Sequence, residues 1–176
     1  MFNNSNIFFS SEADIPAIVS LANSAYRGDS SKKGWTTEAH LLEGELRTDT
    51  ISLAQLLQKP EAAILKHLDD EGSITGCVYL EKQDKKIYLG LLSVSPDKQA
   101  KGIGKKLLVS AEEYARNQNC SSIIMNVISV RQDLISWYVR HGYHPTGETR
   151  PFPVDTRYGV PTQLLELIVL QKNINP

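Results

Sequence analysis

Cysteine, methionine and tryptophan are scarce in this chain of 176 residues, which contains two of each. Cys77 and Cys120 are far apart in the sequence, and each lies beside an expected strand. A fold held together by disulfides would need more cysteines, and a metal site would need ligands at closer spacing. We therefore expect two reduced, packed thiols and no bound metal ion.

Long apolar runs and an excess of one charge are also absent. No segment approaches the roughly 18–20 apolar residues that cross a bilayer, and residues 1–6 lack the basic and apolar regions of a secretory signal. Lys and Arg total 19 against 20 Asp and Glu, whereas nucleic-acid binding usually brings a strong basic excess. We expect a cytoplasmic protein with no membrane or nucleic-acid partner, and the length suits a single domain over residues 1–176.

The hydrophobic periodicity predicts an α/β fold. Its expected strands cover residues 7–9, 62–68, 74–81, 86–94, 123–127, 143–149 and 164–170. The connections between 62–68, 74–81 and 86–94 are too short for a crossover helix, so these strands should be antiparallel neighbours. The pattern predicts a mixed, mostly antiparallel central sheet of six to seven strands, flanked by about four helices.

Helix boundaries follow from capping residues and breakers. A first helix should begin after Ser11 or Asp14 and pack one face through Tyr26. Thr36 or Thr37 is expected to cap a second helix, which carries Leu41 and Leu42. Further helices are expected at 51–58, at 103–115, and from a capping box of Ser129 with Gln132 to Gly142.

A glycine-containing loop joins the strand 86–94 to the strong helix at 103–115. Glycines at such a junction let the backbone approach a ligand, and the first amides of the helix have no partners within it. The helix dipole adds positive potential, so a pyrophosphate suits this position. The lysines of the segment strengthen that preference; they are Lys98, Lys101, Lys105 and Lys106, opposed by Asp97.

Spacing separates the nucleotide motifs that could occupy this loop. A dinucleotide fingerprint would need glycine at position 107, where Leu107 stands. A P-loop would need glycine at position 99 and Ser or Thr at 106, but the chain has Gln99 and Lys106. Both motifs are excluded, and a glycine-rich helix start without any ligand remains the alternative.

Two motifs resemble the GNAT N-acetyltransferase superfamily. Gln99, Gly102 and Gly104 follow a strand that ends in Val-x-Pro, which is similar to the coenzyme A loop of that family. The segment from Leu134 to Tyr143 resembles the family pattern A-x-x-(L/F)-Y-x-x-x-G-F. The resemblance covers residues 7–172 and implies a GNAT-like fold with acetyl-CoA as cosubstrate and no metal.

The resemblance also implies roles for individual residues. The cofactor-binding residues would be Leu92, Ser93, Val94, Gln99, Ala100, Lys101, Gly102, Ile103, Gly104, Lys105, Arg131 and Tyr138. The backbone amide of Val94 would face the thioester carbonyl, on a strand that splays from its neighbour in this family. Tyr138 would protonate the departing thiolate, since a phenol with a pKa of about 10 stays protonated at neutral pH; the alternative is that Tyr138 only packs. Arg131 stands where many members have Asn.

The acceptor side should be built from the first two helices, their connection and the loop between the last strands. Tyr26, Arg27, Trp35 and Glu38 are the substrate-binding candidates, and a solvated surface is the alternative. Many relatives use a Glu on the strand equivalent to 86–94 as general base, but this strand has no acidic residue. The candidates for that role are Glu38, Glu45, Glu81 and Glu148, or a chain of waters.

The function that these motifs imply is direct transfer of acetyl from acetyl-CoA to a primary amine of a small molecule or peptide. A catalytically weak acetyl-CoA-binding sensor or regulatory module is the second hypothesis, and a ligand-free interaction domain the third. Exposed strand edges make a homodimer plausible. The identity of the amine stays open at this stage.

Overall fold

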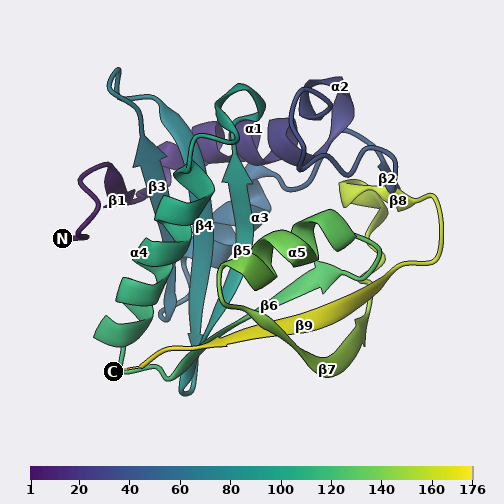
Figure 1. Cartoon of the computed structure of the whole chain (residues 1–176). Helices are drawn as coiled ribbons and strands as arrows, with labels where there is room; N and C mark the ends of the chain where they lie inside the picture. The colour runs from purple at the N-terminus through teal and green to yellow at the C-terminus, as the bar shows by residue number, and fades with distance from the viewer. Residues whose placement is uncertain (176) are drawn as a thin grey trace.

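The computed structural model describes residues 1–175, and a seven-stranded sheet is its centre, in the order β1-β3-β4-β5-β6-β9-β7 (Figure 1). The strands are Ile7–Phe9 (β1), Ala62–Leu68 (β3), Ile74–Gln83 (β4), Lys86–Val94 (β5), Ser122–Ile128 (β6), His144–Pro151 (β7) and Glu166–Asn173 (β9). β5 and β6 are parallel, and the other neighbours are antiparallel. This confirms the mixed, mostly antiparallel sheet, including the antiparallel β3, β4 and β5.

Five helices accompany the sheet within residues 1–175: α1 (Ile15–Tyr26), α2 (Gly28–Ser31), α3 (Thr50–Leu57), α4 (Ile103–Asn117) and α5 (Gln132–Arg140). α1 and α3 cover one face, while α4 and α5 lie on the other (Figure 1). The sequence predicts about four helices, and α2 is a single additional turn after α1. No helix in the described part of the chain is both long and apolar enough to cross a membrane.

The central strands are buried on both faces, because helices cover the sheet from both sides. Val78 of β4 packs in one core cluster with Leu107 of α4, while its neighbour Cys77 packs in the other with Ile18 of α1. Both cysteines are free and buried, as expected, and burial raises the pKa of the Cys77 thiol to about 12. Because α4 packs against the sheet, the loop that precedes this helix is also held in position.

Replacement of Leu107 by alanine tests the packing of α4. Its side chain is fully buried in the core, so Leu107→Ala should lower the free energy of unfolding by about 2–5 kcal/mol through lost apolar burial and a cavity. Chemical denaturation would measure the change. Val109→Ala on the same helix is the control, because Val109 is 43% exposed and should change stability by less than about 0.5 kcal/mol. Equal effects of the two changes would contradict this packing.

β5 and β6 separate along their length. They pair only through Lys86–Tyr88 against Ser122–Ile124, although both strands continue further. Beyond this pairing, between Gly90 and Ser93, the register of β5 with β4 shifts, and Leu91 there has φ +51°, as in a β-bulge. This confirms the splay that the family resemblance implies, and it opens a gap at the centre of the sheet.

The predicted helix at Thr36 or Thr37 is wrong. The chain makes a single turn there, and then Leu42–Glu43 (β2) pairs with Val160–Pro161 (β8) as a small ribbon. The Thr36 hydroxyl donates to the Ala25 carbonyl at 3.0 Å and caps no helix. Leu41 and Leu42 are buried instead in a third core cluster with residues of β6 and of the segment before β9. Tertiary burial thus overrides the local helical pattern.

The predicted capping box before α5 is also wrong. Arg131 is the N-cap residue, and the side chain of Gln132 donates to the Ser129 carbonyl at 2.8 Å. The helix therefore begins two residues later than a cap at Ser129 would place it. α5 ends, as predicted, before Gly142, whose φ of +89° is the left-handed conformation that glycine adopts freely.

Candidate active site

Two cavities meet where β5 leaves β6. The first, which we call the splay cavity, has a volume of about 440 Å³ and lies between the separated strands. The second, the loop cavity, has a volume of about 290 Å³ and lies over the loop before α4. Tyr26, Leu92, Leu134 and Tyr138 line both cavities. The two cavities therefore adjoin at these four residues.

The loop cavity ends at the N-terminus of α4. Gly102 is the N-cap residue with φ +80°, and no side chain caps the helix. The first helical hydrogen bond runs from the Lys106 amide to the Gly102 carbonyl at 3.0 Å. The amides of Ile103, Gly104 and Lys105 therefore have no partner within the helix and are free to donate to an anion.

Space for a ligand remains beside these amides. A Cβ atom on Gly102 would meet no heavy atom within 4 Å, so the backbone is open on that side. A Cβ on Gly104 would lie 3.2 Å from Cζ2 of Trp137, inside the loop cavity. Lys98, Gln99, Ala100 and Lys105 also line this cavity, whereas Lys101 does not.

Gln99 connects the loop to the segment after α2. Its Oε1 accepts from the Trp35 amide at 2.8 Å, and its Nε2 donates to the Thr36 hydroxyl at 2.8 Å and to the Val94 carbonyl at 3.1 Å. The side chain therefore uses its hydrogen-bonding groups within the protein. The family resemblance implies that Gln99 binds the cofactor. In the structure its side chain also connects the glycine loop to Trp35 and Thr36, which line the loop cavity.

Aromatic side chains form the opposite wall of the loop cavity. The ring of Trp35 lies 6.1 Å from that of Trp137, which in turn lies 5.0 Å from Tyr138 and 4.3 Å from His141. Trp35 is 38% exposed and lines this cavity. The structure thus places Trp35, which was predicted on the acceptor side, at the loop cavity and not at the splay cavity.

Tyr138 is presented to both cavities by the buried face of α5. The residue is 5% exposed, and its ring packs edge-on to Tyr143 at 5.7 Å. Burial raises the pKa of the Tyr138 phenol well above its ordinary value of 10, because the phenolate would lose its hydration. The Tyr138 phenol therefore stays protonated throughout the neutral range.

The geometry of β5 directs the backbone amide of Val94 into the gap. The amide of Ser95 donates to the Thr75 carbonyl on the β4 side at 3.0 Å. Amides of successive residues in a strand point to opposite edges, so that of Val94 points away from β4. On the same open edge, the Leu92 carbonyl accepts from the Tyr26 hydroxyl. Ser93, which was expected at the site, is buried and lines neither cavity.

A buried ionic network forms one side of the splay cavity. Arg27 pairs with the Glu38 carboxylate and donates from Nη2 to the Tyr158 carbonyl at 3.1 Å. Burial lowers the pKa of Arg27, although the neighbouring Glu38 opposes this effect. Nη1 of Arg131 approaches Glu38 to 3.8 Å and donates to the Thr36 carbonyl at 3.2 Å. Glu38 is thus held between two arginines.

Comparison with known proteins decides the family. A model of the Acetyltransferase (GNAT) family matches residues 16–143, which include the glycine loop and α5. The chain belongs to the GNAT family. Members of this family use acetyl-CoA as the acetyl donor.

Similar proteins are also acetyltransferases. A curated acetyltransferase of Agrobacterium fabrum is 30% identical over 83 residues, which are 47% of this chain and 59% of that protein. The crystal structure of the ribosomal-protein-S18-alanine N-acetyltransferase from Escherichia coli superposes with a TM-score of 0.71 at 15% identity, covering 97% of this chain and 94% of the other. The structure of a ribosomal-protein-alanine N-acetyltransferase from Brucella melitensis gives a TM-score of 0.70 at 21% identity, covering 95% of this chain and 98% of the other. At these identities the structures establish the GNAT fold alone.

This GNAT protein departs from the expected cofactor contacts at Arg131. Its guanidinium pairs with Asp133 at 3.0 Å and with the network around Glu38, and the residue lines neither cavity. The structure therefore does not bring Arg131 to the loop cavity, from which the predicted Ser93 and Lys101 are also absent. A buried arginine bonds internally because an unpaired buried charge is costly.

Of the four glutamates predicted as general base, Glu38 alone lines the splay cavity. Glu45 lies beside Gly28, and Glu148 pairs with Arg150 at the surface at 2.9 Å. Glu81 accepts from the Tyr79 hydroxyl at 2.6 Å and pairs with Lys59 at 2.9 Å. Residues 1–175 contain no group of three His, Cys, Asp or Glu side chains placed to hold a metal ion.

The splay cavity contains residues that sequence reasoning did not select. Asn126, Phe152 and Tyr158 line it together with Arg47 and the predicted Tyr26, Arg27 and Glu38. The loop that supplies Phe152 and Tyr158 was expected on the acceptor side, but nothing in its sequence singles out these two positions. The Tyr158 hydroxyl donates to Asp49 at 2.7 Å, which ties this loop to α3.

Proposed function

We propose that this GNAT protein transfers the acetyl group of acetyl-CoA to a primary amine of a small molecule or peptide, by direct attack. The observation that carries the proposal is the meeting of the two cavities at Tyr138, beside the gap between β5 and β6. The donor enters from the loop cavity and the amine from the splay cavity. No covalent intermediate on the protein is needed, because both reactants reach the same point.

The donor's diphosphate would bind the open amides at the start of α4, assisted by Lys98 and Lys105. Its pantetheine arm would follow the loop cavity toward Val94, along the edge of β5 that β6 leaves free. Two features support this placement: the helix start without a side-chain cap, and the cavity that runs from it to Tyr138. Acetyl-CoA supplies an activated thioester carbonyl.

Transfer needs two donors at the reacting atoms. As the amine nitrogen bonds to the carbonyl carbon, the backbone amide of Val94 donates to the carbonyl oxygen, where negative charge develops; such a donor contributes roughly 3–4 kcal/mol. The carbon–sulfur bond then breaks, and the sulfur takes a proton from the Tyr138 phenol. The products are the amide and free CoA thiol; the amine's proton leaves to solvent, and the Tyr138 phenolate takes a proton back from solvent.

The state of Glu38 favours a second candidate function. This carboxylate lines the splay cavity, but it is already paired with Arg27 and Arg131. A protein that binds acetyl-CoA and turns over slowly, as a sensor or regulatory module, would need no free carboxylate in this cavity. Direct transfer stays our first proposal because Tyr138 and Val94 serve steps that a sensor does not perform.

Two measurements on the full chain separate these functions. Acetyl-CoA should raise the melting temperature, since a ligand that binds only the native state stabilises it. Release of free CoA thiol should then depend on a primary amine, tested with amino acids, polyamines, aminoglycosides and peptide N-termini. Stabilisation without turnover on any of these would favour the module. No stabilisation at all would overturn both functions and favour a ligand-free interaction domain.

A further inference from the structure

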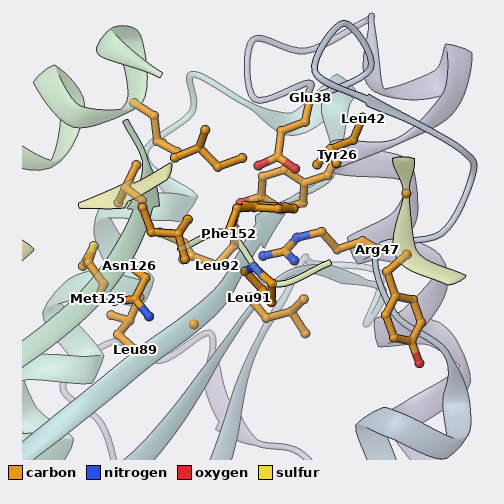
Figure 2. A pocket seen from close by; sticks show the side chains of 18 of the residues that line it. Tyr26, Glu38, Leu42, Arg47, Leu89, Leu91, Leu92, Met125, Asn126 and Phe152 are labelled. Atoms are coloured by element: carbon orange, nitrogen blue, oxygen red, sulfur yellow. Dashed lines mark hydrogen bonds between the residues drawn. The ribbon is translucent and has the colours of Figure 1, made fainter. Parts of the chain in front are cut away.

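Arg47 reaches into the splay cavity from the segment between β2 and α3. Its backbone amide is anchored to the Asn23 side chain at 2.6 Å, and its guanidinium carbon lies 5.2 Å from the centre of the Tyr26 ring. Figure 2 shows the guanidinium pointing toward the middle of the cavity, among Tyr26, Leu91 and Leu92. The end of the side chain thus lies beside Tyr26, which lines both cavities.

No carboxylate of residues 1–175 pairs with this guanidinium, and its Nε atom is buried without a hydrogen-bond partner. The splay cavity does contain two carboxylates, Glu38 and Asp155. Glu38 is held by Arg27 and Arg131, and Asp155 pairs with Arg157 at 2.6 Å. Both carboxylates are therefore already paired with other arginines, and no acidic side chain of the splay cavity compensates the positive charge of Arg47.

A half-buried arginine without a counter-ion is a binding group for an anion. Removing a charge from water is costly unless a partner of opposite sign is supplied. The planar guanidinium presents two parallel N–H groups, which match the two oxygens of a carboxylate. Contact with the Tyr26 ring also holds the guanidinium in one orientation before any ligand arrives.

We propose that the acceptor is an amine that also carries a carboxylate, and that Arg47 binds this carboxylate; the inference rests on the proposed transferase function. The amine must reach the meeting point of the cavities, which Tyr26 and Tyr138 line. Because the guanidinium of Arg47 lies beside Tyr26, the carboxylate and the amine must be close together in the molecule, as in an amino acid. Leu91, Leu92 and Phe152 provide an apolar lining for its side chain.

Matched acceptors test this inference. CoA release is measured with L-leucine, L-methionine and L-phenylalanine, with their C-terminal amides, and with the amines that lack the carboxyl carbon. A charge-assisted contact should favour the carboxylates by about 10–100-fold in kcat/KM. Arg47→Gln should remove most of this preference through a higher KM, and Arg47→Lys should keep part of it. An aminophosphonate in the same panel distinguishes a carboxylate site from a general anion site.

Controls separate this inference from the proposed function. Arg116→Gln, an exposed arginine of α4, should leave the preference unchanged, and the stabilisation by acetyl-CoA should persist in all variants. A wild-type protein that acetylates the amides as well as the amino acids would overturn the inference while the transferase function stands. So would an unchanged preference in Arg47→Gln. If no acceptor is turned over, the affinity for these amino acids is measured instead, by calorimetric titration in the presence of CoA. Equal affinities of the wild type and Arg47→Gln would overturn the inference.

Discussion

Replacing Tyr138 by phenylalanine should lower kcat by about 10²–10⁴-fold, the usual contribution of proton transfer by a positioned side chain. The ring, which fills the junction of the two cavities, is kept, so the affinity for acetyl-CoA should stay close to that of the wild type. Steady-state kinetics with a productive amine, together with calorimetric titration of acetyl-CoA, would separate the two quantities. A kcat close to that of the wild type would mean that Tyr138 only packs.

Tyr143→Phe is the matched control for this change. Tyr143 is also buried, its ring packs against that of Tyr138, and its hydroxyl has no hydrogen-bond partner. Tyr143 lines neither cavity, so removing its hydroxyl should leave kcat unchanged. The buried hydroxyl makes no hydrogen bond, so its loss should not lower stability. A fall in kcat as large as that of Tyr138→Phe would show that general loosening of α5 explains both.

The pH dependence gives a second reading of Tyr138. Its pKa is raised well above 10 by burial, so the phenol keeps its proton as the pH rises through the neutral range. The rate should therefore not fall between about pH 7 and 9 on account of Tyr138, and deprotonation of the amine should make it rise. If the pH–rate profile of the wild type falls in this range, and the fall is absent in Tyr138→Phe, the raised pKa of Tyr138 would be contradicted.

Replacing Gly102 by valine should weaken acetyl-CoA binding by about 10–100-fold, through loss of charge-assisted hydrogen bonds from the start of α4. Gly102 has φ +80°, which a β-branched residue avoids, so the backbone shifts and the amides turn away from the diphosphate. The affinity would be measured by calorimetric titration. Wild-type affinity in this variant would mean that the donor binds elsewhere.

Gly72→Val provides a control with the same backbone strain. Gly72 has φ +81°, and a Cβ at either glycine would meet no heavy atom within 4 Å. Both variants should lose about 1–3 kcal/mol of stability, the usual cost of forcing such a residue into this conformation. Only Gly102→Val should lose affinity, since Gly72 lies in the turn between β3 and β4. Equal loss in both would indicate a general effect of destabilisation.

Local sequence signals predicted those parts of the fold that depend on neighbouring residues. The strands at Ala62–Leu68 and Lys86–Val94 have the predicted bounds, because both are bounded by polar turns or a proline. The loop before α4 could also be read directly, since a left-handed glycine at a helix start is a short-range feature. The segment after α2 could not be predicted in this way, because Leu41 and Leu42 are buried by contacts with β6 and with the residues before β9.

The sequence by itself determined the seven strands of the main sheet and the glycine loop before α4, since each depends on residues within about one helical turn or one strand. The family resemblance, and not local structure, singled out Tyr138. Only the tertiary structure decided that Trp35 faces the loop cavity, that Arg131 serves an internal ion pair, and that Arg47 has no counter-ion. Those outcomes depend on which distant charges and rings meet across the gap between β5 and β6. Residue type alone specifies a charge, but its partner is set by the packing of the whole chain.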